Sequence, residues 1–226
     1  AYKASGDDVV LEVVKNSQKG IMKSHTESHH RFKLADLPKR TQEHILKPDI
    51  FTFAKSSERS RVHRPAYPDY ISVKKFNSKG EVVGERRYLG LYTAKVYNER
   101  PSEIPLLRRK TADVIARSGL NMGDYGGKEL DQILSVYPRD ELFQINSDEL
   151  FDVAMGILYA QERRKIRLFM REDAYGRFVS CLVYVPREVY STDLRRKMEK
   201  VLIEAVNGVD IDFMTFFSES VLARTQ

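Results

Sequence analysis

The stretch that decides the fold begins at residue 142 with LFQINSDELFDVAMGILYAQERRKIRLFM and ends at residue 217 with VLIEAVNGVDIDFMTFF. Residues 142–145 are a short apolar run of the kind that forms a strand. Ser147 then supplies an N-cap with an acidic first turn, and apolar residues recur at helical spacing up to a basic end at 163–165. We therefore predict a strand followed by a helix with one apolar face.

The second half of the stretch predicts a hairpin, a second helix and a last strand. Residues 166–171 alternate between apolar and charged, and residues 178–185 are rich in β-branched and aromatic types. Ser191 caps the second helix and Gly208 ends it, before residues 211–217 alternate again. The resulting order, β-α-β-β-α-β, is that of a ferredoxin-like sandwich, which is also the order of small ligand-sensing domains of the ACT type.

Both predicted helices should cover the same face of the four-stranded sheet, because each has only one apolar stripe to bury. The opposite face is then open. We expect Phe169, Met214 and Phe216 on that open face, since side chains alternate along a strand. Exposed patches of this kind usually mark an interface, so we predict a contact with the first module of the chain or with another subunit.

The composition is that of a globular protein with room for one large or two ordinary domains. The chain has 226 residues, of which 42% are hydrophobic and 31% are charged. It contains no apolar run of membrane-spanning length, no signal peptide, and a single cysteine, which excludes an internal disulfide. We expect a cytoplasmic protein without membrane contact, and a fragment of a longer chain, because it begins at Ala1 in the middle of a pattern.

The rest of the chain indicates two further modules. Residues 67–76 and 81–93 read as strands joined by the turn sequence NSKG, which predicts an antiparallel sheet. Helical patterns follow between Pro101 and Pro138. The predicted fold class is α+β, with three parts: an antiparallel sheet module at 1–100, a helical connector at 101–138 and the βαββαβ module at 139–226.

Positive charge is spread along the chain rather than concentrated in one segment. The net charge of +6 comes from 38 basic and 32 acidic residues. Four basic clusters border or interrupt helical or strand patterns: Arg86-Arg87, Arg108-Arg109-Lys110, Arg163-Arg164-Lys165 and Arg195-Arg196-Lys197. Solvated faces and helix ends account for them, so nucleic-acid binding is kept as the alternative function and is regarded as unlikely.

One short segment is dense in groups that could contact an anion. Arg59, Arg61, His63 and Arg64 are four cationic or titratable groups within six residues. Arginine offers a fixed fork of donors to a carboxylate or phosphate, which makes this segment a candidate effector contact. The alternative is that these side chains pair with acidic residues of the same module, such as Asp69, Glu81 or Glu85.

Neither a metal site nor a dinucleotide site can be recognised in the sequence. His25, His29 and His30 lie close together but do not form the H-E-x-x-H pattern of a zinc hydrolase. The glycines between residues 119 and 127 do not have the G-x-G-x-x-G spacing after a strand. We therefore predict no catalytic, cofactor-binding or metal-binding residue.

Five blocks of sequence, taken in order, carry a family resemblance: RVHRP at 61–65, GERRYLGLYT at 84–93, IPLLRRK at 104–110, YPRDELFQ at 137–144 and YGRFVSCLVYVPR at 175–187. Together they resemble the amino-terminal half of the large bacterial NAD-specific glutamate dehydrogenases. That resemblance implies PAS-like and ACT-like modules, which precede a helical region and a carboxy-terminal catalytic domain in a long chain.

The function implied by the resemblance is that of a non-catalytic regulatory and assembly region. The parent enzyme would be an oligomer that converts glutamate and NAD to 2-oxoglutarate, ammonium and NADH, with NAD bound outside this fragment. The implied partners are the remainder of the chain, further copies of it and an amino-acid effector. Many amino-acid-binding ACT domains have a glycine after the first strand, whereas this sequence has Asn146-Ser147-Asp148, so a pure packing role stays open.

Overall fold

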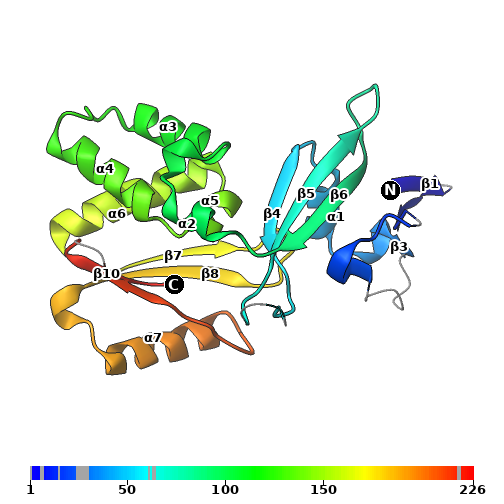
Figure 1. The fold of residues 1–226 in the computed structure, drawn as a ribbon. Coiled ribbons are helices and arrows are strands. Elements are labelled where there is room, and N and C mark those ends of the chain that lie inside the picture. The colour runs from blue at the N-terminus through cyan, green and yellow to red at the C-terminus, as the bar shows by residue number, and fades with distance from the viewer. Residues whose placement is uncertain are drawn as a thin grey trace. The chain divides into compact units, whose positions relative to one another are not determined.

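The computed structural model describes residues 2–5, 8–14, 16–23, 31–60, 62, 65–217 and 220–226. The chain divides into two compact units: Ala1–Tyr92 with Asp173–Arg177, and Thr93–Glu172 with Phe178–Gln226. Figure 1 shows an antiparallel sheet in each. The α+β fold class is therefore confirmed, while the finer division into modules at residues 100 and 138 stays a prediction.

The described part of the first unit contains two three-stranded antiparallel sheets and one α-helix. The first sheet has the order β1 (Tyr2–Ser5), β2 (Asp8–Glu12) and β3 (Arg31–Lys33). The second has the order β4 (Phe51–Lys55), β5 (Asp69–Phe76) and β6 (Val82–Gly90). Helix α1 (Lys39–Leu46) and the 3-10 turns η1 (Gly20–Lys23) and η2 (Leu34–Asp36) connect them. Leu11, Leu34 and Ile45 form a small core with Tyr175 of the turn at 173–177.

The hairpin predicted in the first unit is confirmed. Strands β5 and β6 pair from Asp69 opposite Gly90 to Phe76 opposite Val82. The turn is held by Asn77, whose Oδ1 accepts hydrogen bonds from the backbone N–H groups of Lys79 and Glu81 at 2.9 and 3.0 Å. An asparagine side chain that bonds the backbone just ahead of it is a common way to close a turn.

The described part of the second unit has one four-stranded sheet with helices on both of its sides. The sheet has the order β7 (Arg167–Glu172), β8 (Val179–Pro186), β10 (Leu222–Thr225) and β9 (Thr215–Phe217), with all neighbours antiparallel. The helices are α2 (Ala94–Asn98), α3 (Leu107–Ser118), α4 (Tyr125–Val136), α5 (Arg139–Gln144), α6 (Ser147–Arg163) and α7 (Thr192–Ala205). The 3-10 turns are η3 (Pro101–Glu103) and η4 (Arg187–Val189). Figure 1 shows α2–α6 on one side of the sheet and α7 on the other.

The predicted order of elements, β-α-β-β-α-β, needs two corrections. Residues 142–145 are not a strand, because they fall in the second half of α5 and at its end. Asp140 and Glu141 in the first turn favour that helix, and a short apolar run does not distinguish a strand from a buried helix. Strand β10, which was not predicted, takes a central place between β8 and β9.

The helices and the hairpin of this unit are confirmed, with small shifts at their ends. Helix α6 is capped by Asn146 rather than by Ser147, since the Asn146 side chain accepts a hydrogen bond from the N–H of Glu149. Helix α7 is capped by Ser191 as predicted. None of the helices within the described ranges is both long and apolar enough to cross a membrane.

The prediction that both helices share one face of the sheet is wrong, and this changes which side chains are open. Phe169 lies under α6, where a Cβ atom added to Gly156 would approach its ring to 2.8 Å. It is therefore not on an open face. Met214 and Phe216 are exposed by 72% and 41%, and their role in an interface stays a prediction.

Candidate functional site

A small pocket of about 150 Å³ lies in the second unit, where helices α5 and α6 meet the β7–β8 hairpin. Its wall has an apolar part and a polar part. The apolar part includes Phe169, Val153 and Leu182, and the polar part includes Glu141, Glu149, Asp152, Arg171 and Ser180. A volume of that size holds a molecule of only a few heavy atoms, because one water in the liquid occupies about 30 Å³.

One side of the pocket is a buried ion pair between β7 and α5. Arg171 contacts Glu141 through Nε to Oε1 and through Nη2 to Oε2, the latter at 3.0 Å. Its Nη2 also donates to Oε1 of Gln144 at 2.9 Å. The side chains of Arg171 and Glu141 are only 12% and 5% exposed. This two-fold contact neutralises the charge of Arg171 and holds β7 to α5. The guanidinium of Arg171 is therefore already paired with Glu141 in the absence of a ligand.

Behind that pair, the buried amine of Lys110 holds helix α3 to the end of helix α5. Its Nζ donates to the carbonyl oxygens of Leu142, Phe143 and Ile145 at 2.8, 3.1 and 2.6 Å. Burial and the nearby charge of Arg171 lower the pKa of Lys110 to about 8, against the opposite effect of Glu141. The last carbonyls of a helix lack partners within it and carry the negative end of its dipole, which explains why an ammonium group is placed there.

The opposite side of the pocket offers acceptors that are still available. Glu149 and Asp152 form no ion pair within the described part of the chain, and both line the pocket. The Oγ atom of Ser180 is buried and has no hydrogen-bond partner among the described residues. Two carboxylates and a hydroxyl beside an apolar wall suit a small group that donates hydrogen bonds and carries positive charge, such as a primary ammonium.

The first unit has a comparable polar cluster, centred on Glu85 of β6. Its carboxylate accepts hydrogen bonds from the hydroxyls of Tyr70 and Ser72 at 3.1 and 2.5 Å and pairs with Arg87. Burial raises the pKa of Glu85, but the charge of Arg87 and these hydrogen bonds outweigh it, so the pKa lies below its ordinary value. All of these partners of the Glu85 carboxylate belong to β5 or β6, which indicates that the cluster stabilises the sheet.

Lys74 of β5 caps helix α1 in the same way as Lys110 caps α5. Its Nζ donates to the carbonyl oxygens of His44 and Lys47 at 2.6 and 2.7 Å. Burial lowers the pKa of Lys74, while the nearby carboxylates of Glu85 and Asp49 act in the opposite direction.

The predicted anion contact can be followed at one residue only. The guanidinium of Arg59 lies 5.0 Å from the centre of the Tyr67 ring. Arg61, His63 and Arg64 lie outside the described residues, so this contact stays a prediction. The acidic residues proposed as alternative partners have other contacts: Asp69 pairs with Lys55 at 2.8 Å, Glu81 accepts from Asn77 Nδ2 at 2.7 Å, and Glu85 belongs to the cluster described above.

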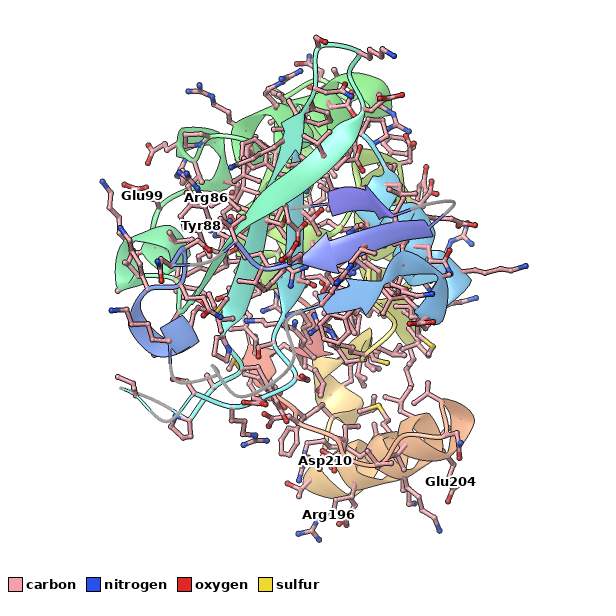
Figure 2. All side chains as sticks on the ribbon, turned by 90° about the vertical axis from the view of Figure 1, so that its right-hand side faces the viewer. Arg86, Tyr88, Glu99, Arg196, Glu204 and Asp210 are labelled. Atoms are coloured by element: carbon pink, nitrogen blue, oxygen red, sulfur yellow. The ribbon has the colours of Figure 1, made fainter. Side chains whose placement is uncertain are left out.

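The prediction that the basic clusters are solvated faces or helix ends does not hold for every residue in them. Arg86 and Arg196 are exposed and labelled in Figure 2. Their neighbours Arg87 and Arg195 pair with Glu85 and Glu199; the side chain of Arg195 is only 15% exposed, whereas that of Arg87 is 46% exposed. The amine of Lys110 donates its hydrogen bonds to carbonyl oxygens at the end of α5. The contacts of Lys110 could not be predicted from the sequence, because its carbonyl acceptors lie 32 to 35 residues away along the chain.

The glycines between α3 and α4 have a packing explanation. Gly119 ends α3 in the left-handed region, with a φ of 65°. A Cβ atom on Gly127 would lie 2.2 Å from the carbonyl oxygen of Asn121. These glycines join two helices, whereas a dinucleotide fingerprint joins a strand to a helix.

Metal ligation has no candidate in the part of the chain that the structure describes. No group of three or more His, Cys, Asp or Glu side chains there could hold an ion. His25, His29 and His30 lie outside the described residues. Burial raises the pKa of the Cys181 thiol, which disfavours the reactive thiolate.

Two family models match the second unit and define its class. Residues 104–163, which include α3–α6, match the helical motif 1 of glutamate dehydrogenase. Residues 167–226, which include β7–β10 and α7, match the ACT2 domain of glutamate dehydrogenase. The ACT-type assignment of the sheet in the second unit is thereby confirmed, and both models describe segments of glutamate dehydrogenases.

Three relatives named NAD-specific glutamate dehydrogenase match most of the chain. The chain is 47% identical over 216 residues to the NAD-specific glutamate dehydrogenase of Halomonas elongata and 53% identical over 183 residues to that of Pseudomonas aeruginosa. These matches cover 96% and 81% of the chain but only 13% and 11% of the relatives. The Mycobacterium tuberculosis enzyme of the same name is 33% identical over 171 residues. The chain belongs to the family of NAD-specific glutamate dehydrogenases and spans about a tenth of the length of these relatives.

Proposed function

We propose that the chain is a non-catalytic regulatory and assembly region of a cytoplasmic NAD-dependent glutamate dehydrogenase. The parent reaction is the oxidative deamination of L-glutamate to 2-oxoglutarate and ammonium, with reduction of NAD. The observation that carries this proposal is the pair of matches to a helical motif and an ACT2 domain within about a tenth of the relatives' length. The catalytic domain and the NAD site then belong to the remainder of the long chain.

The contacts within the second unit support a structural and regulatory role. Arg171 and Lys110, which could otherwise bind an anionic substrate, are held by Glu141 and by the end of α5. The polar groups that stay available in the pocket are the carboxylates of Glu149 and Asp152 and the hydroxyl of Ser180, which can donate as well as accept. A site of that charge does not suit the phosphates of a dinucleotide.

For regulation, we infer that the pocket takes the ammonium group of a small amino-acid effector. Glu149 and Asp152 would receive the ammonium, while Phe169 and Leu182 would contact its apolar part. A ligand in this place touches α5, α6 and the β7–β8 hairpin together, and it would tighten the contact between the helical motif and the ACT-type sheet. Nothing in the arrangement of the basic clusters favours nucleic-acid binding.

A thermal-shift series on the chain tests the regulatory role. The twenty amino acids, their decarboxylated amines and 2-oxoglutarate are compared, because a ligand that binds only the folded state raises the melting temperature. We expect a rise with at least one amino acid or amine and none with 2-oxoglutarate. Asp152→Asn should remove the rise, whereas the matched change Asp131→Asn, outside the pocket lining, should keep it. A shift that survives Asp152→Asn and Glu149→Gln together would contradict this site.

A further inference from the structure

One hairpin of the chain is divided between the two units. Its strands β7 and β8 belong to the second unit, whereas the turn between them, Asp173–Arg177, is part of the first. We call residues 167–186 the shared hairpin. The two strands pair without a break from Arg167 opposite Tyr184 to Glu172 opposite Val179, directly beside the turn. A displacement of the strands therefore reaches the turn through the backbone itself.

The turn of the shared hairpin is built to keep its shape. The fully buried Asp173 accepts a hydrogen bond at Oδ2 from the N–H of Tyr175 at 3.0 Å. Its backbone carbonyl accepts from the N–H of Gly176 at 2.9 Å. Gly176 has a φ of 67°, which glycine adopts without strain. An aspartate that bonds the backbone two residues ahead is a common way to fix a turn, so this turn should move as one piece.

The side chains of the turn are embedded in the first unit. Tyr175 packs against the small core described above, and its ring meets those of His44 and Tyr70 edge to face, at 5.1 and 5.8 Å between centres. The Nη2 atom of Arg177 donates to the backbone carbonyl of Lys55 at 2.7 Å. The turn is thus held by side chains or backbone of α1, β5 and β4.

Tyr70 extends these contacts to the polar cluster of the first unit. Its hydroxyl donates to Oε1 of Glu85 at 3.1 Å. The guanidinium of Arg87 lies 5.6 Å from the centre of the same ring. A change in the position of the turn therefore acts on a ring that also contacts the buried Glu85 carboxylate and its partner.

The other end of the shared hairpin forms one wall of the pocket. Phe169 and Arg171 of β7 and Ser180 and Leu182 of β8 line it, with Arg171 directly opposite Ser180. Only Glu172 separates Arg171 from the turn. Neither strand has a glycine, a proline or a bulge between the pocket and the turn, and these are the features that usually bend a strand. The pocket wall and the turn are two ends of one stiff element.

We propose that the shared hairpin transmits occupancy of the pocket to the first unit, where it tightens the contacts of β5. An ammonium ligand that contacts Phe169 and Ser180 restrains the two strands, and the turn passes this restraint to Tyr70. Coupling of this kind is reciprocal, so releasing the turn changes the affinity of the pocket by the same factor. The inference rests on the proposed function for the existence of a pocket ligand, but the coupling itself can be tested without one.

The first test displaces the pocket end of the hairpin without a ligand. A Cβ atom added to Gly156 would come within 2.8 Å of the Phe169 ring, so Gly156→Ala has to move that ring. Hydrogen exchange of the 226-residue chain should then change in β7 and become at least about fivefold faster in β5. Gly126→Ala is the matched control, because its Cβ atom would meet Leu120 at 3.6 Å, an ordinary contact distance. The control should leave β5 unchanged.

The same measurement with Tyr175→Ala tests the route. Once this ring no longer anchors the turn, adding Gly156→Ala should not accelerate exchange in β5 any further. An altered β7 with an unchanged β5, or an acceleration that survives Tyr175→Ala, overturns the inference. If Tyr175→Ala unfolds the first unit, Arg177→Met, which loses the bond to Lys55, is used in its place. If Gly156→Ala leaves β7 unchanged, Phe169→Ala supplies the displacement.

A ligand measurement separates this inference from the proposed function. Ethylamine is the probe, because its ammonium group and short apolar tail match the two parts of the pocket wall. At saturating ethylamine we expect slower hydrogen exchange in both α6 and β5. Slower exchange in α6 alone would support the pocket and overturn the coupling. No change in either element would count against the ammonium site, while the variants without ligand still decide the coupling.

Discussion

Two buried lysines, one in each unit, perform the same local task in different electrostatic surroundings. Lys74 donates to two carbonyls at the end of α1, and Lys110 donates to three carbonyls at the end of α5. Lys74 has the carboxylates of Glu85 and Asp49 nearby, whereas Lys110 has the cation of Arg171 as its strongest charged neighbour. The capping geometry is shared, but the charged neighbours differ: two carboxylates oppose the lowering of the pKa of Lys74, whereas Arg171 adds to the effect of burial and the pKa of Lys110 falls to about 8.

The comparison also concerns the helices that these lysines cap. Helices α1 and α5 both begin after a proline, Pro38 and Pro138, and neither has a side-chain cap at its start. They have 8 and 6 residues. Helices this short are not stable alone, so tertiary contacts at their ends decide whether they form. The lysines supply such a contact in each unit.

The largest effect is expected from removing the acidic partner in each unit. Glu141→Gln leaves Arg171 and Lys110 without their shared carboxylate in a buried site, and it should destabilise the second unit by about 3–5 kcal/mol. Glu85→Gln should cost less, because its partner Arg87 is 46% exposed and remains solvated. Hydrogen exchange of peptides from α5 and β6 measures each effect in its own unit. A larger loss of protection from Glu85→Gln than from Glu141→Gln would show that the exposure of the paired arginine does not determine the loss of stability.

A smaller effect should appear as a pH dependence that only Lys110 shows strongly. Its pKa is lowered to about 8 in the folded chain, and an unfolded lysine titrates near about 10.4. Between these values the unfolded chain binds more protons, so stability rises with pH across this window, by about 2 kcal/mol from pH 7 to pH 9.5. Urea unfolding of wild type and Lys110→Met at several pH values isolates this contribution.

The matched variant is Lys74→Met. The difference in unfolding free energy between Lys74→Met and wild type should change less over the same pH range, because two carboxylates oppose the fall in the pKa of Lys74. Equal pH dependence for Lys74→Met and Lys110→Met would show that the charged neighbours do not distinguish the two sites.

The smallest effect is expected at a helix that does not depend on a lysine. Helix α6 is capped at its start by Asn146, which accepts from the N–H of Glu149 at 2.8 Å. Asn146→Ala should cost about 1 kcal/mol, the usual value for an N-cap. Asn146→Asp, which keeps the acceptor, is the control and should unfold at the same urea concentration as wild type within error.

The sequence predicted those elements whose signals are local. Helices α6 and α7 and the β7–β8 hairpin follow from periodicity, caps and alternation that lie within each segment. The strand predicted at residues 142–145 is wrong because a four-residue apolar run fits a strand and a buried helix equally well. Strand β10 was missed because Leu222–Thr225 is short and its place between β8 and β9 comes entirely from long-range pairing.

The candidate site could be predicted only in part, for the same reason. Basic residues in a cluster look like a solvated surface, and nothing near Lys110 in the sequence indicates that its amine lies against the end of α5. The pocket joins Glu149 and Asp152 of one helix to Ser180 of a strand, which no local pattern brings together. The absence of a dinucleotide fingerprint, in contrast, could be read directly from the spacing of the glycines.

The central claim, that this region has no catalytic or coenzyme site of its own, is tested most directly by calorimetric titration of NAD into the 226-residue chain, followed by an assay for glutamate-dependent NADH formation. We expect no saturable heat and no NADH from the chain, while the full-length enzyme measured alongside should show both. Saturable NAD binding by the chain, or NADH formation above the background without protein, would contradict it.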